Sequence, residues 1–178
     1  MDKEIPITER YPEKSRLGLY RLHDRFFSFW FRYVFPYRSR LEIGNTDYLL
    51  ARIDETFQQH LSLVYEDVCR ELCLDLLKQG IMNFSAIGRW WAKNKEIDLV
   101  ALDDETRTIW FGECKWSAKP VGEDVYRDLR RKAELVEWGG RERHVRSILF
   151  SGRGFTAGMR QEAKQDGVVL VSGEQLAG

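Results

Sequence analysis

The 178-residue sequence has few cysteines, few prolines and no excess of charge of either sign. Its three cysteines form no Cys-x-x-Cys pair and no Cys/His group with zinc-ligand spacing, which argues against a disulfide framework or a zinc site. We expect reduced, mostly buried thiols in a cytoplasmic protein. The 28 basic and 28 acidic residues balance, so the chain is not one that coats nucleic acid non-specifically, although a local basic groove stays compatible with neutrality.

Long apolar runs are also missing. The longest aromatic run, residues 26–35, contains Arg32 and is too short to span a bilayer, so no membrane partner is expected. The first residues are charged and polar, which predicts no signal peptide. No G-x-x-x-x-G-K-[ST] motif occurs, so this chain cannot bind ATP through such a loop.

The length suits one domain with an appended segment, and we divide the chain into residues 1–45 and 46–178. In the first part, Asp24 is placed to cap a helix that begins near Phe26 and stops at Pro36. That helix is apolar nearly all round, which predicts burial against the core or a partner chain. The side chains expected to be buried are Phe26, Phe29, Trp30 and Tyr33.

Residues 37–45 predict a turn, and a long helix to about Gln79 is expected after it. Its expected core-facing stripe is Leu61, Val64, Val68, Leu72 and Leu76. From residue 84 the hydrophobic period changes to that of strands. The expected strands are 84–91, 96–103, 108–116, 144–151 and 168–171, and the expected helices are 123–138 and 156–166. The order α-β-β-β-α-β-α-β predicts an α/β fold with a mixed central sheet and helices on both faces.

The most informative pattern is the hairpin predicted from strands 96–103 and 108–116. Glu113 and Lys115 are two residues apart and therefore share one face of a strand. If residues 103–107 form the turn, Asp98 lies close to opposite Glu113. Two opposed carboxylates destabilise a sheet, and a divalent cation with oxygen ligands removes that cost. The pattern thus predicts metal-assisted phosphodiester hydrolysis.

Asp98 followed by Glu113-Cys114-Lys115, on the second and third strands after a long helix, resembles the PD-(D/E)XK superfamily. The resemblance implies a restriction-endonuclease-like fold and a Mg²⁺ or Mn²⁺ ion held by Asp98, Glu113 and the carbonyl of Cys114. Lys115 would then position or deprotonate the attacking water, or stabilise charge on the phosphate.

A second resemblance covers nearly the whole chain. Residues 20–34, 88–91, 96–101 and 111–116 look like the C-terminal nuclease-like domain of archaeal-type P-loop ATPases and the segment before it. This resemblance implies an ATPase module in cis or in trans, with residues 1–45 as a linker to it.

Glu66 is a further candidate, because this superfamily often carries a metal-supporting acid on its first core helix. It lies at the edge of the apolar arc with Cys69 and Cys73, and we expect it to be nearer the protein body than Asp67. The alternative is a surface i,i+4 pair with Arg70, and neither interpretation is preferred.

Candidate nucleic-acid contacts are Arg89, Trp91, Tyr126, Arg130 and Lys132. Aromatic and arginine side chains stack on bases, and cations contact phosphates. The alternatives are sheet packing for the first two and a solvated, charge-balanced helix face for the others.

Together these patterns predict a metal-dependent DNA endonuclease. The alternative is a catalytically inactive nuclease-fold module for DNA binding or protein docking, which needs no metal. A purely structural interpretation, a buried pair of Lys115 with a carboxylate, has the weakness that such pairs are poor stabilisers.

Overall fold

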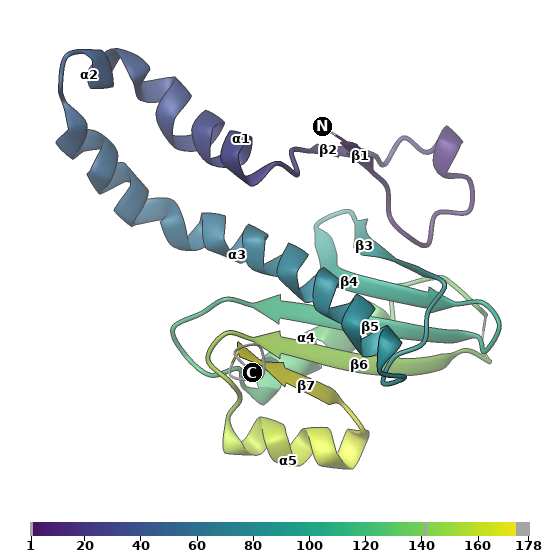
Figure 1. Ribbon diagram of the computed structural model, residues 1–178. Helices are drawn as coiled ribbons and strands as arrows, with labels where there is room; N and C mark the ends of the chain where they lie inside the picture. Colours follow the sequence, from purple (N-terminus) through teal and green to yellow (C-terminus); the bar gives the residue numbers. More distant parts are fainter. Residues whose placement is uncertain (1, 141, 174–178) are drawn as a thin grey trace.

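The computed structural model describes residues 2–140 and 142–173 (Figure 1). Its main sheet has the strand order β3-β4-β5-β6-β7. The strands are β3 Ala86–Ala92, β4 Lys95–Asp103, β5 Thr108–Lys115, β6 His144–Ser151 and β7 Val169–Ser172. Neighbours are antiparallel from β3 to β5 and parallel from β5 to β7. The mixed five-stranded sheet and the expected element order are therefore confirmed.

Helices cover both faces of this sheet. The covering helices are α3 Thr46–Lys78, α4 Glu123–Ala133 and α5 Ala157–Asp166, and they are preceded in the chain by α1 Arg25–Phe29 and α2 Arg38–Glu42. On one face, Cys69 and Cys73 of α3 are fully buried in a cluster with Ile148 of β6. On the other face, Leu129 of α4 and Met159 of α5 pack in the cluster of Phe111. The three cysteines are free and buried, as expected.

Gly112 lets the α3 face close over the centre of β5. A Cβ atom at this position would lie 3.0 Å from Leu99 and 3.1 Å from Ile148. A larger residue would push those two side chains away from the sheet, so the strand needs a glycine here.

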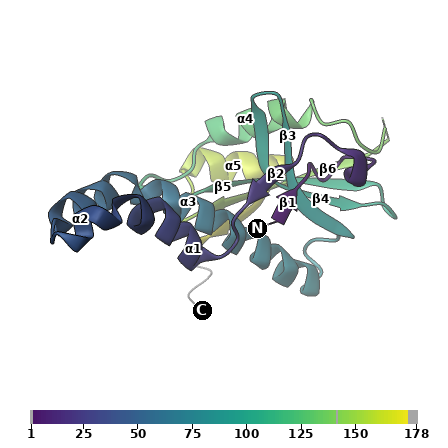
Figure 2. The ribbon, with the colours of Figure 1, turned by 90° about the horizontal axis from the view of Figure 1, so that it is seen from above.

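The first helices form an arm that projects beyond the sheet and lies along the first half of α3 (Figures 1 and 2). Two of its four aromatic residues expected to be buried are covered within this chain, and burial of the other two against a partner chain stays a prediction. Tyr33 is buried and Phe29 is half-buried, but Phe26 is 64% and Trp30 is 37% exposed. The reason is geometric, because the arm packs on one neighbour only. The rings of Phe29 and Tyr33 contact His60 of α3, while the opposite side faces solvent.

In the arm, the helical path does not stop at Pro36 as expected, and α2 occupies part of the turn expected at residues 37–45. A π-helical turn at Trp30–Val34 and a 3-10 turn at Phe35–Tyr37 lead directly into α2. Proline in the first turn of a helix loses no hydrogen bond, so Pro36 does not end the helical path. Gly44, in the left-handed conformation, follows the end of α2.

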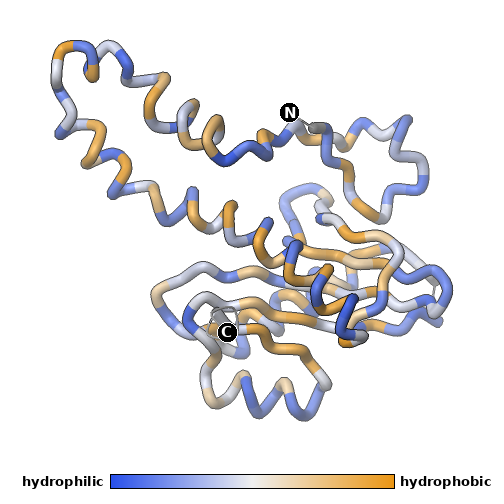
Figure 3. The backbone as a smooth tube through the Cα atoms, viewed as in Figure 1, coloured by the Kyte–Doolittle hydropathy of each residue, from blue (hydrophilic) through white to orange (hydrophobic). Residues whose placement is uncertain are grey.

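The end of α4 and the buried face of α3 also differ from what the sequence predicts. α4 ends at Ala133 rather than near residue 138. The buried face of α3 centres on Tyr65, Cys69 and Cys73, whereas Val68 is 37% exposed. In Figure 3 hydrophobic residues lie along the central strands of the sheet and also along α1 and α2 in the arm.

A small N-terminal hairpin lies against the edge of the sheet. β1 Asp2–Glu4 pairs with β2 Leu19–Arg21 in an antiparallel ribbon. The backbone N–H of Ile7 donates to the carbonyl of Arg89 on β3 at 2.9 Å. The hairpin is thereby placed next to α3 and β3. Across the residues described, no helix combines the length and the apolar character needed to cross a bilayer.

Candidate functional site

Asp98 and Glu113, here called the carboxylate pair, lie level on adjacent strands. The β4–β5 ladder includes the pair Leu99–Gly112, and Asp98 and Glu113 are the residues that adjoin this pair on the two strands. Both are buried, at 8% and 4% exposure. Burial, and then the neighbouring charge of Asp98, raise the pKa of Glu113. The hairpin thus holds two acids together at a place where their charges repel.

Two lysines neutralise Glu113. The Nζ atom of Lys115 lies 2.7 Å from Glu113 Oε1, and the Nζ atom of Lys132 on α4 lies 3.2 Å from both carboxylate oxygens. Burial lowers the pKa of Lys115, but Glu113 outweighs this and the net pKa is raised. Lys115 is therefore a fixed cation at neutral pH and is poorly suited to take a proton from water.

Cys114 contributes its backbone to the site. Its N–H donates to Asp98 Oδ2 at 2.9 Å, which fixes the orientation of that carboxylate. Its thiol lies in the core with Cys69, and a hydrogen bond with the Cys69 side chain, followed by burial, raises the pKa of the thiol well above its ordinary value. The thiol is accordingly inert, and only the main chain of this residue is available to a ligand.

Glu66 does not pair with Arg70. Its Oε2 atom lies 3.5 Å from Arg21 Nη2 and 3.8 Å from Arg89 Nη2, and it has no hydrogen-bond partner among the residues described. Burial, and then the charge of Asp98, raise the pKa of Glu66 to about 7. Glu66 is therefore close enough to Asp98 for the two charges to repel each other.

The expected order of burial along α3 is wrong, because Asp67 is more buried than Glu66. Asp67 is 8% exposed and forms ion pairs with Arg21, Arg25 and Arg70. Arg21 and Arg25 lie more than forty positions earlier in the chain, so no helical pattern in α3 could reveal this environment. The sequence interpretation missed these arginines for the same reason.

The side chains of the candidate site supply oxygen atoms of the kind that bind Mg²⁺ or Mn²⁺. Within residues 2–140 and 142–173, no group of three or more His, Cys, Asp or Glu side chains is arranged to hold a metal ion. The donor chemistry still fits a hard cation, since Asp98 raises the pKa of both Glu66 and Glu113 and a buried oxygen of Glu66 lacks a hydrogen bond. A cation bound here would share the carboxylate of Glu113 with Lys115 and Lys132.

The two residues of β3 expected to contact nucleic acid, Arg89 and Trp91, also contact the N-terminal segment. Trp91 Nε1 donates to the carbonyl of Leu17 at 3.1 Å. Arg89 forms ion pairs with Glu4, Glu66 and Glu96. Arg89 lies at the rim of the candidate site, while Trp91 is half-buried by its contact.

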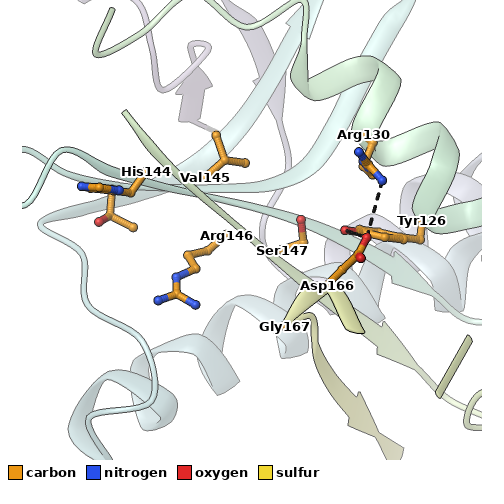
Figure 4. A pocket seen from close by; sticks show the side chains of 9 residues that line it. Tyr126, Arg130, His144, Val145, Arg146, Ser147, Asp166 and Gly167 are labelled. Carbon is orange, nitrogen blue, oxygen red and sulfur yellow. Dashed lines mark hydrogen bonds and ion pairs between the residues drawn. The ribbon is translucent and has the colours of Figure 1, made fainter. Parts of the chain in front are cut away.

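Tyr126 and Arg130 lie away from the carboxylate pair. They line a cavity of about 780 Å³ with Thr108 and His144, at the amino ends of β5 and β6 (Figure 4). The hydroxyl of Tyr126 donates to Asp166 Oδ2 at 3.0 Å, and Arg130 Nη1 lies 3.5 Å from the same oxygen. Of the helix residues expected to contact nucleic acid, only Lys132 reaches the candidate site.

The chain matches other proteins of undetermined function. A family described as archaeal and bacterial proteins of unknown function, DUF234, matches residues 30–132. The uncharacterized protein MJECL04 of Methanocaldococcus jannaschii is 34% identical over 175 residues, which are 96% of this chain and 37% of that relative. The chain therefore spans little more than a third of the relative's length. No solved structure matches the chain.

Proposed function

Since the chain belongs to the DUF234 family of archaeal and bacterial proteins of unknown function, we propose its function from its own site: a metal-dependent endonuclease domain that hydrolyses DNA phosphodiester bonds. The observation that supports this proposal is the buried carboxylate pair with Lys115 beside it. Two buried acids on adjacent strands repel each other, and a divalent cation compensates for that repulsion. The α/β fold with a mixed sheet is compatible with a restriction-endonuclease-like assignment, which belongs to the same proposal.

The proposed roles follow from chemistry at each atom. Asp98, Glu113 and the carbonyl of Cys114 hold Mg²⁺ or Mn²⁺, and Glu66 supports the ion directly or through water. A bound divalent ion supplies an activated water and a Lewis acid at neutral pH. Lys115 stabilises the negative charge that builds on the phosphate, since its raised pKa keeps it protonated. Lys132 balances Glu113 when no metal is present.

Calorimetric titration with Mn²⁺ tests the site. We expect one binding event in the wild type and none for Asp98→Asn, which keeps the shape of the side chain but removes its charge. The matched control is Asp104→Asn in the exposed turn of the same hairpin, which should bind like the wild type. Absence of Mn²⁺ binding at millimolar metal would end the proposal.

Cleavage of plasmid DNA in Mn²⁺ tests the role of Lys115. Lys115→Ala should lose cleavage and keep Mn²⁺ binding, because an ammonium group is not a metal ligand. Lys119→Ala, at an exposed position a few residues along, is the control. Cleavage at the wild-type rate by Lys115→Ala or Glu113→Ala would show that the activity comes from a contaminant.

One observation favours a second candidate function, a catalytically inactive module for DNA binding or protein docking. Glu113 is already neutralised by two lysines, so the site can exist without a cation. In either function we propose an ATPase module as partner, in cis or in trans, on the basis of the resemblance in residues 20–34. Mn²⁺ binding separates the two candidates, because a docking module does not need the ion.

A further inference from the structure

Four basic side chains surround the carboxylate of Glu4 at the end of β1. They come from three parts of the chain: the β2 segment, α3 and β3. The nearest nitrogen–oxygen distances are 3.8 Å for Arg21, 3.7 Å for His23, 3.9 Å for Arg70 and 3.8 Å for Arg89. We call Arg21, Arg70 and Arg89 the arginine cage.

Glu4 satisfies this cage poorly. All four distances exceed the length of a charge-assisted hydrogen bond. Arg21 Nη1, Arg70 Nε and Arg89 Nε are buried and have no hydrogen-bond partner among the residues described. The ion pairs of these arginines with Glu66, Asp67 and Glu96 do not supply an acceptor to the three nitrogens. Buried charged donors without acceptors cost stability.

A phosphate group fits the same space better. It is tetrahedral, carries more acceptor oxygens than a carboxylate, and matches the donor fork of arginine. Other acids also contact members of the cage: Asp67 pairs with Arg21 and Arg70 as well as with Arg25, and Glu96 pairs with Arg89. Glu4 is the acid that contacts all three arginines, so its displacement would free a donor on each of them.

The position of the cage suggests where that phosphate comes from. Arg21 and Arg89 contact both Glu4 and Glu66. Glu66 in turn lies close enough to Asp98 for repulsion between the two charges. A phosphate in the cage would therefore lie beside the proposed metal site.

We propose that the arginine cage binds a backbone phosphate of a nucleic acid, and that Glu4 occupies the cage until this phosphate displaces it. The assignment to nucleic acid rests on the proposed function, whereas the binding of a phosphate group does not. Displacement requires only that the Glu4 side chain swing away, while Ile7 keeps the segment anchored on β3.

Calorimetry in EDTA, with inorganic phosphate and with a short single-stranded DNA, tests the cage without any metal. Glu4→Gln should tighten binding of both probes by about tenfold, because it removes a competing charge worth about 1.4 kcal/mol. Glu13→Gln, at an exposed position, should leave the affinity unchanged. Arg70→Gln should weaken both probes by about tenfold or more, while Arg131→Gln on the exposed face of α4 should not.

The proposal is overturned if Glu4→Gln binds both probes no tighter than the wild type. If Arg70→Gln fails to fold, Glu4→Gln still decides, because a gain of affinity cannot come from unfolding. Phosphate binding that responds to Glu4→Gln, with DNA binding that does not, would overturn the nucleic-acid part alone. If these results are obtained but the wild type binds no Mn²⁺, the proposed nuclease function fails and the proposal for the cage stands.

Discussion

Glu66 carries a buried charge that the folded protein tolerates poorly. Burial and Asp98 raise its pKa from 4.5 to about 7, even though Arg89 and Arg21 oppose the shift. Between these values the folded state holds a proton that the unfolded state has lost. Stability therefore falls as the pH rises from about 4.5 to about 7 and is constant above that range. At this residue the candidate site lowers the stability of the metal-free protein.

Glu66→Gln should remove this penalty. The free energy of unfolding of the variant minus that of the wild type should rise by roughly 2–3 kcal/mol as the pH is raised from 5 to 8. The reason is that the neutral amide does not titrate, whereas the wild-type carboxyl group does. Urea denaturation at the two pH values measures the change. Glu71→Gln, exposed on the same helix, is the control and should show no such trend. If the pH dependence of Glu66→Gln is no larger than that of Glu71→Gln, then Glu66 has an ordinary pKa in the folded protein.

The arm, which comprises α1 and α2 and lies along the first half of α3, is held by few side chains. Tyr33 is its buried anchor, and Thr56 Oγ1 of α3 donates to the Tyr33 hydroxyl at 3.2 Å. Phe26, Phe31 and Phe35 are each more than half exposed. An element with few buried contacts and a large apolar surface opens more easily than the sheet, and it is prone to association.

Tyr33→Ala should loosen the arm by about 3 kcal/mol, since it leaves a cavity where an aromatic side chain was buried. Hydrogen exchange should accelerate in α1 and in the first half of α3 and stay slow in β4 and β5. Phe31→Ala, at 52% exposure, should leave exchange near the wild-type rate. Uniform acceleration across the sheet would show that the arm and the sheet unfold as one unit.

At the scale of the whole molecule, charges from distant parts of the chain converge at one edge of the sheet. The N-terminal hairpin brings Glu4 and Arg21 to α3 and β3, next to the acids of the candidate site. A neutral chain thus contains local regions of strong charge of both signs. A divalent cation at the carboxylates would be linked to the folding of the whole molecule.

Mn²⁺ should consequently raise the melting temperature. At 100 times its Kd, an ion that binds only the folded state adds about 2.7 kcal/mol. The apparent affinity should be higher at pH 8 than at pH 6, because the pKa of Glu66 is about 7 and metal ligands must be deprotonated. Scanning calorimetry at both pH values measures this shift. The same shift in Asp98→Asn would place the ion elsewhere.

Local pattern was enough to predict the element order, the mixed sheet and the hairpin that sets Asp98 opposite Glu113. Strand period and turn position act over a few residues, and they fix which side chains share a face. Tertiary packing alone decided that Lys132 reaches Glu113, that Asp67 is buried and that three arginines surround Glu4. It also left Phe26 and Trp30 exposed. These contacts join residues from separate elements, and only the docking of those elements determines which side chains meet.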